Sequence, residues 1–240
     1  MNAATFFDGE EWRDGTIEMI DGRMLLRPGS PASDLLLSDL PRLDGLIVGG
    51  FTDHHVHLQL VDHALLHDST LGRVIDLGGN PAAVAALSEG AARFVAVEFA
   101  GAFLTSVGGY PSDRDWAPAG SFREIADTAA ATAAVAEMAD AGASCIKVAN
   151  NSTAGPVFSD LLFRAIVEAA AARGLPVVAH AEGVGEAQRA ARLGAARLAH
   201  APFTERLDDA EVAAQAASVS WISTLAIHEG DTHALSLIHI

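Results

Sequence analysis

The feature that most constrains the fold of this chain is a regular alternation, beginning near residue 46, between short apolar runs and alanine-rich segments. Each apolar run has the length of one strand, and each alanine-rich segment has the length of one helix. The expected strands share this apolar character: Leu46–Leu58, Gly72–Leu77, Arg93–Phe99, Ser144–Ala149, Pro176–His180, Ala196–His200 and Ser220–Ala226. Such βα repetition with short connections predicts a parallel sheet, either open or closed into a barrel.

Local signals predict several helix ends between these strands. Ser121-Phe-Arg-Glu124 has the spacing of a capping box and predicts a helix that begins there and ends near Gly142. A second helix over residues 160–173 is expected to end at Gly174. Asp208, which has a glutamate three residues later, is expected to begin a third helix.

Residues 1–45 do not follow the βα pattern. Residues 6–10 and 15–24 are short alternating segments separated by Asp-Gly turns, and they predict a small antiparallel sheet. Residues 27–41 contain three prolines and are expected to form a loop. We therefore expect a small N-terminal β flank over residues 1–45, followed by a separate domain.

The number of strands favours a barrel that is incomplete in this chain. A closed (β/α)8 barrel needs about 250 residues, so one that starts near residue 46 would extend to about residue 300. The chain has 240 residues, and seven strands are expected in it. We therefore predict an α/β fold with an incomplete TIM-type barrel of about seven strands over residues 46–234.

The segment Leu235–Ile240 is interpreted as an artefact of sequencing. The DNA sequence CTG-TCT-CTT-ATA-CAC-ATC encodes it and matches the transposon mosaic-end adapter of shotgun libraries, in which a stop triplet follows. A genuine short apolar tail is the alternative. We exclude residues 235–240, including His239, from the functional argument. A barrel cut at this point would leave two strand edges unpaired, so we expect this chain to have poor solubility and little activity.

Composition excludes several classes of partner. The 15 lysine and arginine residues against 31 aspartate and glutamate residues give a formal charge of -16, which repels nucleic acid and anionic membranes. No run approaches about 18 consecutive apolar residues, and the N-terminus lacks the features of a signal peptide, so we expect no membrane span. The single cysteine, Cys145, excludes an internal disulfide and fits a cytoplasmic protein. The sequence leaves open whether the chain forms a homo-oligomer.

A histidine pair lies at the end of the first expected barrel strand. Side chains alternate between the two faces of a strand, so His55 and His57 point the same way, together with Asp53. Two imidazoles one pleat apart can reach one divalent ion, and neutral imidazole is the commonest protein ligand of zinc. A His-x-His pair does not decide for a metal by itself, because histidine pairs are common on protein surfaces.

Other strand ends carry residues of the same chemical type. Lys147 lies inside an apolar strand, where an unpaired ammonium is unfavourable. His180 and His200 each end an apolar strand. A buried, hydrogen-bonded core residue is the plain interpretation of each one taken singly. Because parallel barrels place their sites at the carboxyl ends of their strands, the four strand ends together favour one shared site.

The first barrel strand resembles the signature of a known family. Gly50–Leu58 is similar to the glycine-aromatic-x-Asp-x-His-x-His signature of the amidohydrolase superfamily, although Gly49 stands where that family usually has proline. Four further segments are similar to its imidazolonepropionase-related and prolidase-like branch: Arg73–Gly79, Gly108–Pro111, Ala141–Val148 and Gly174–Gly183. The resemblance extends over the chain to about residue 230.

The resemblance implies a site with two divalent metal ions, and zinc is the expected metal. His55 and His57 would bind the more buried ion, and His180 and His200 the second. Lys147 would be carboxylated by CO2 and bridge the two ions, since a buried neutral amine can form a carbamate whereas an ammonium cannot ligate a cation. Because imidazolonepropionase itself lacks this lysine, Lys147 favours the prolidase-like relatives.

The remaining site residues are less completely specified. The family's last ligand is an aspartate at the end of strand 8, which also transfers the proton, and it would lie beyond residue 234. No catalytic acid or base is therefore assigned within this chain. Tyr110 and His228 follow expected strands and could contact substrate, although local packing is an equally good interpretation of Tyr110. Glu182 lies close to His180 and either supports it or has a capping or surface role.

The reaction implied by the resemblance is hydrolysis of a C–N bond in a small molecule by metal-activated hydroxide, on a dipeptide-like, acyl-amino-acid or cyclic amide substrate. Fold alone does not determine the reaction, so a deaminase or a phosphotriester or lactone hydrolase is the second hypothesis. A non-catalytic barrel scaffold is the third. Such scaffolds lose their metal ligands, whereas five of the six expected ligands are present here.

Overall fold

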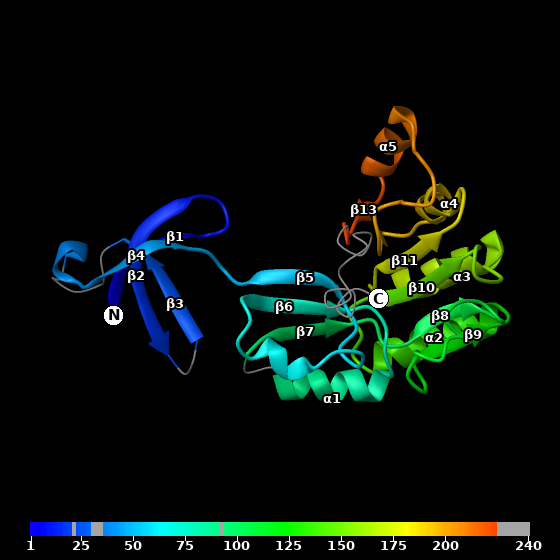
Figure 1. Cartoon of the computed structure of the whole chain (residues 1–240), viewed down its shortest axis with the longest axis horizontal. Helices are drawn as coiled ribbons and strands as arrows, with labels where there is room; N and C mark the ends of the chain where they lie inside the picture. Colours follow the sequence, from blue (N-terminus) through cyan, green and yellow to red (C-terminus); the bar gives the residue numbers. More distant parts are fainter. Residues whose placement is uncertain (21–22, 30–35, 92–93, 225–240) are drawn as a thin grey trace. The chain divides into compact units, whose positions relative to one another are not determined.

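The computed structural model describes residues 1–20, 23–29, 36–91 and 94–224. The chain divides into two compact units, Met1–Phe51 and Thr52–Ile240. Figure 1 shows both in the colours of the sequence. The expectations that concern His228 and residues 235–240 lie outside the described ranges.

The N-terminal unit is a four-stranded sheet with the strand order β3-β2-β1-β4. Its strands are β1 (Asn2–Phe7), β2 (Trp12–Ile20), β3 (Arg23–Pro28) and β4 (Arg42–Ile47), with a short 3-10 turn, η1 (Leu37–Asp39), before β4. The pairs β1–β2 and β2–β3 are antiparallel, as expected, whereas β1 and β4 are parallel. Alternate residues of β1 and β2 turn inward, so Ala4, Phe6 and Ile17 are buried.

The expectation of one continuous strand over Leu46–Leu58 is wrong. Leu46 and Ile47 belong to β4 in the N-terminal sheet, and β5 (Phe51–Val56) begins a second sheet. Gly49 and Gly50 lie between the two strands, outside either ladder. Glycine weakens strand propagation because it has no side chain to pack and loses much conformational entropy, so the apolar run breaks there.

The second unit contains the expected parallel strands. A three-stranded sheet has the order β5-β6-β7, and a six-stranded sheet has the order β13-β12-β11-β10-β8-β9. Its strands after β5 are β6 (Leu71–Asp76), β7 (Ala96–Phe99), β8 (Phe103–Ser106), β9 (Phe122–Ile125), β10 (Ile146–Asn151), β11 (Val177–Glu182), β12 (Arg197–Leu198) and β13 (Ser220–Trp221). The pairs β6–β7, β8–β9, β8–β10, β10–β11, β11–β12 and β12–β13 are all parallel.

One backbone hydrogen bond links β7 to the segment just before β10, because the Ser144 N–H donates to the Phe99 carbonyl at 2.8 Å. In addition, β7 and β8 follow one another closely in the chain. The neighbouring strands are β5, β6 and β7 in the first sheet, and β8, β10, β11, β12 and β13 in the second. The carboxyl ends of parallel strands lie on one side, so the residues at these ends can form one site.

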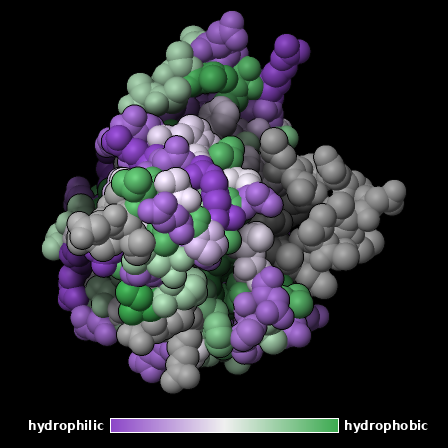
Figure 2. All heavy atoms as spheres, turned by 90° about the vertical axis from the view of Figure 1, so that its left-hand side faces the viewer, coloured by the Kyte–Doolittle hydropathy of each residue, from purple (hydrophilic) through white to green (hydrophobic). Residues whose placement is uncertain are grey.

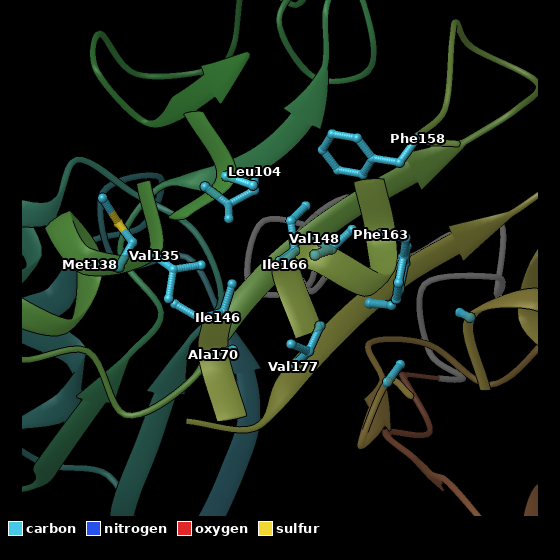
Figure 3. Packing of buried hydrophobic residues seen from close by; sticks show 14 of the residues in the cluster. Leu104, Val135, Met138, Ile146, Val148, Phe158, Phe163, Ile166, Ala170 and Val177 are labelled. Carbon is cyan, nitrogen blue, oxygen red and sulfur yellow. The ribbon is translucent and has the colours of Figure 1, made fainter. Parts of the chain in front are cut away.

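The helices are α1 (Pro81–Ala91), α2 (Thr128–Asp140), α3 (Asp160–Ala171), α4 (Glu186–Arg192) and α5 (Asp209–Ala216), with a 3-10 turn η2 (His63–Leu66). Figure 3 shows the core that α2 and α3 form against the sheet. Val135 and Met138 of α2, and Phe163 and Ile166 of α3, are almost fully buried against strand residues such as Ile146. Burial of each such side chain contributes about 1.5–3 kcal/mol, so this layer fixes the strands that carry the site.

The helix expected to begin at Ser121 begins later. Residues Phe122–Ile125 form β9, which pairs with β8, and α2 begins at Thr128. The N-cap of α2 is Asp127, whose carboxylate accepts the Ala130 N–H at 2.7 Å. The β8 ladder satisfies the backbone groups of β9, so tertiary pairing overrides the local capping signal. The caps expected for the other two helices are present at Gly174, which has φ +70°, and at Asp208.

Within the described ranges, no helix is long and apolar enough to cross a membrane. The surface seen in Figure 2 mixes hydrophilic and apolar side chains.

Candidate metal centre

His55 and His57 lie at the end of β5 with their rings directed toward one another. Both side chains are buried, and their Nε2 atoms lie 3.2 Å apart. The Nδ1 atom of His55 is 2.9 Å from the Ala199 carbonyl oxygen, and the Nδ1 atom of His57 is 2.9 Å from the Gly78 carbonyl oxygen. Two main-chain groups therefore determine how these rings are turned.

These contacts assign the tautomers. A carbonyl oxygen only accepts, so each Nδ1 carries the proton, and in a neutral ring Nε2 then has a lone pair. Burial, followed by the nearby Lys147, His57 and His200, lowers the pKa of His55 well below its usual value, which keeps its ring neutral. An Nε2 atom with a lone pair is the donor with which a neutral imidazole binds a divalent cation, and the two Nε2 atoms lie 3.2 Å apart.

His180 and His200 form a second pair at the ends of β11 and β12. Their ring centroids are 5.0 Å apart, and the His200 ring is 4.8 Å from that of His55. The Nδ1 atom of His200 contacts the Thr224 hydroxyl at 2.7 Å, and the Nε2 atom of His180 contacts a Glu182 carboxylate oxygen at 3.1 Å. Burial lowers the pKa of His180, although Glu182 acts in the opposite direction. Side-chain groups therefore help to hold both rings of this second pair.

Lys147 is the second residue of β10, so the expectation that it lies at the carboxyl end of its strand is wrong; Ala149, two residues later, is the one that stands opposite His180. In the β10 ladder Lys147 stands opposite Phe103 of β8 and Val178 of β11, and its side chain is 1 % exposed. Among the described residues it forms no ion pair. Burial lowers its pKa to about 7, so the neutral amine is well populated at neutral pH. The sequence argument that this lysine is unpaired in an apolar strand is thus supported by its surroundings.

The described residues contain no group of three or more histidine, cysteine, aspartate or glutamate side chains placed to hold one ion. The four histidine rings form a row in the order His57, His55, His200 and His180, with neighbouring centroids 5.1, 4.8 and 5.0 Å apart. Each pair needs a further donor to complete the four-coordinate geometry that zinc adopts. Lys147 is the buried residue that could provide it after conversion to a carbamate.

Asp76 is a fully buried carboxylate that the sequence analysis did not single out. It accepts hydrogen bonds from the Leu58 N–H at 2.7 Å and from the Gly78 N–H at 2.9 Å. Burial raises its pKa to about 7, and the two N–H groups and Lys147 counteract this rise. The available signal was its position at the end of an apolar strand, before two glycines.

Aromatic side chains surround the His180 side of the centre. The Tyr110 ring stacks on His180 with centroids 5.3 Å apart and an angle of 29° between the planes. Burial raises the pKa of Tyr110 to about 12, so its phenol is neutral and can donate a hydrogen bond. Trp116 lies 6.0 Å from Tyr110, and Phe203 lies 6.1 Å from His200; the sequence analysis named neither. The structure thus brings Tyr110 to the centre, while His228 lies outside the described residues.

A cavity of about 820 Å³ borders Thr224, which contacts His200, but none of the four histidines of the centre lines it. It lies between the start of β5 and the segment 220–224, and Thr224 forms part of its wall.

The carboxylate of Glu182, which contacts His180, also accepts a hydrogen bond from the Asn151 amide at 2.7 Å. Glu182 therefore belongs to the surroundings of His180 and is not a helix cap.

Comparison with known proteins identifies the fold. No family model matches the chain, and no curated protein matches it in sequence. Solved structures do match. A Xaa-Pro dipeptidase with bound methionine is 16% identical, with a TM-score of 0.70 over 99% of this chain and 71% of its own. A candidate prolidase from Bifidobacterium longum is 21% identical, with a TM-score of 0.67 over 94% of this chain and 61% of its own.

The A. niger ochratoxinase is 18% identical, with a TM-score of 0.66 over 95% of this chain and 66% of its own. The chain has the fold of these solved structures. The α/β class and the parallel sheets expected from the sequence are confirmed.

Proposed function

We propose that this protein is a metal-dependent hydrolase of the prolidase-like amidohydrolases, which splits a C–N bond in a dipeptide-like or cyclic amide. The observation that carries the proposal is the 3.2 Å approach of the His55 and His57 Nε2 atoms at the end of β5, beside a second histidine pair and a buried lysine. The similar solved structures include a dipeptidase and a phenylurea hydrolase, which supports this reaction class.

In this proposal His55 and His57 hold the more buried of two divalent ions, and His180 and His200 hold the other. When bound, two zinc ions would polarise a carbonyl and lower the pKa of water to about 7. The Lys147 amine attacks CO2, so an N–C bond forms and an amine proton leaves. The resulting carbamate would replace an ammonium, which could not face a cation, and Lys147 would thereby provide an anionic ligand shared by both ions.

The chain's own residues would orient the substrate. Tyr110 lies against His180, and its neutral phenol is placed to donate a hydrogen bond to a substrate oxygen. His228 is proposed as a second substrate contact on its sequence position alone. The carboxylate that moves the proton to the leaving nitrogen is not assigned to a residue of this chain. We place the enzyme in the cytoplasm, with a small molecule as its substrate.

The proposal is tested by measuring metal content and turnover together. The protein is stripped with a chelator, reloaded with Zn2+ in bicarbonate buffer, and assayed against a panel of dipeptides, N-acyl amino acids and cyclic amides. We expect two ions per chain and hydrolysis that depends on them, with stoichiometric release of amine. Release of ammonia alone would favour a deaminase, and turnover limited to lactones or phosphotriesters would favour the other hydrolases. Metal-independent binding without turnover would indicate a scaffold.

A further inference from the structure

Asp76 occupies the space between the ends of β5 and β6, directly beside the first histidine pair. Backbone pairing of these strands ends with the Leu77 N–H, which donates to the Val56 carbonyl at 2.9 Å. Two residues beyond Val56, which ends β5, the Leu58 N–H donates to Asp76 Oδ2 at 2.7 Å. A side-chain carboxylate therefore continues the contact between the strands beyond the last backbone bond.

The second oxygen of Asp76 fixes the turn after β6. The Gly78 N–H donates to Oδ1 at 2.9 Å, and the carbonyl of the same residue accepts the Nδ1 proton of His57 at 2.9 Å. A side chain at Gly78 would collide with the ring of Phe103, so the turn has little room to move on that side. The orientation of the Gly78 carbonyl therefore determines how the ring of His57 is turned.

Both hydrogen bonds of Asp76 act on His57. The Leu58 N–H belongs to the peptide that follows His57, so Asp76 holds the main chain of this histidine with one oxygen. With the other oxygen it holds the group that orients the imidazole. Both donors are N–H groups in a site closed to water, so no solvent could replace either bond if the carboxylate were lost.

We propose that Asp76 is the positioning residue of His57, which sets the direction of its Nε2 atom toward a bound divalent cation. The inference rests on the proposed function, because it assumes that the histidine pair binds metal. Asp76 touches neither the cation nor the substrate. Groups that orient a metal ligand in this way commonly change metal affinity roughly 10–100-fold when they are replaced.

The test uses Asp76→Asn, which keeps the shape of the side chain. An amide has one acceptor oxygen, so one of the two N–H groups loses its acceptor. Asp127→Asn is the matched control, because Asp127 also accepts a backbone N–H in the same unit but caps α2. Each purified protein is stripped and titrated with Zn2+ against a chromophoric chelator, and its Co2+ form is examined by visible absorption.

We expect Asp76→Asn to bind the tighter Zn2+ roughly 10–100-fold more weakly and to change the Co2+ spectrum, while Asp127→Asn retains wild-type values. Wild-type affinity and spectrum in a folded Asp76→Asn would overturn the positioning role and leave the proposed function intact. A wild-type protein that binds no Zn2+ would overturn both. Should Asp76→Asn fail to fold by circular dichroism, Asp76→Glu, which keeps both acceptor oxygens, is measured in its place. Unfolding of both variants would assign Asp76 to the fold alone and overturn the proposal.

Discussion

The two histidine pairs of the candidate metal centre differ in what holds their rings. His55 and His57 are 1 % and 2 % exposed, and main-chain carbonyls fix both Nδ1 atoms. His180 and His200 are 8 % and 9 % exposed, and side chains, Glu182 and Thr224, hold them. Main-chain groups therefore hold the rings of the first pair, whereas replacing a single side chain would remove one support of the second pair.

This difference suggests a division of work within the centre. A ring held by main-chain groups keeps its direction with little reorganisation, which suits an ion that stays bound. The second pair lies beside Tyr110 and is slightly more exposed than the first, so a substrate could approach it. Lys147 lies between the two halves and is the residue expected to make them one site.

The largest effect is expected from Lys147→Ala, which would break the link between the halves. Without the bridging anion, we expect at least one of two Zn2+ ions to be lost per chain. Turnover should fall by about 10³-fold, since a metal Lewis acid contributes several kcal/mol. Metal analysis by atomic emission and an amide hydrolysis assay would measure both. An unchanged ion count would refute the bridging role of Lys147.

The second effect tests whether the His180 and His200 half depends on its side-chain supports. Thr224 has φ +37°, a left-handed conformation that is unfavourable for a β-branched residue, and its hydroxyl holds His200. Thr224→Val keeps the shape and removes the hydroxyl, so we expect the weaker Zn2+ to bind roughly 10–100-fold more weakly. A competition titration that separates two binding steps would measure this.

The control for that experiment is Glu182→Gln, which retains an oxygen that can accept from His180. Its loss in metal affinity should be smaller, about tenfold or less. If Thr224→Val weakened the tighter step and left the weaker one unchanged, the separation of the centre into two halves would be wrong.

Much of this arrangement could be predicted from periodicity. Alternation placed His55 and His57 on one face of a strand, and apolar runs placed Lys147 inside a strand and His180 and His200 near strand ends, because both patterns are local in the sequence. The strand β9 could not be predicted, since Ser121-Phe-Arg-Glu124 carries a helix signal that pairing with β8 overrides.

The groups that hold the histidine rings could not be predicted from local sequence patterns either. Ala199 lies 144 residues from His55 along the chain, and Thr224 lies 24 residues from His200. Asp76 contacts Leu58 across 18 residues. Such contacts depend on strand register and on the path of each turn, which a pattern of residue types does not encode.

The smallest effect is expected at Asp160, a charged residue that lies outside the His180 half of the centre. Hydrogen bonds from Arg189 and then Arg192 lower the pKa of Asp160 below its usual value of 3.8. A lowered pKa stabilises the fold above the unfolded value, and this contribution is lost as the pH falls through the folded value. Asp160→Asn should therefore lower the Tm by about 1–2 °C at pH 7 and flatten the loss of Tm below about pH 4.

Arg189 belongs to α4, which packs on the strand that carries His180. Because Glu182 and Thr224 hold this half locally, Zn2+ affinity should stay at the wild-type value in Asp160→Asn. A tenfold loss would show that the outer layer, and not these two side chains, positions the second pair.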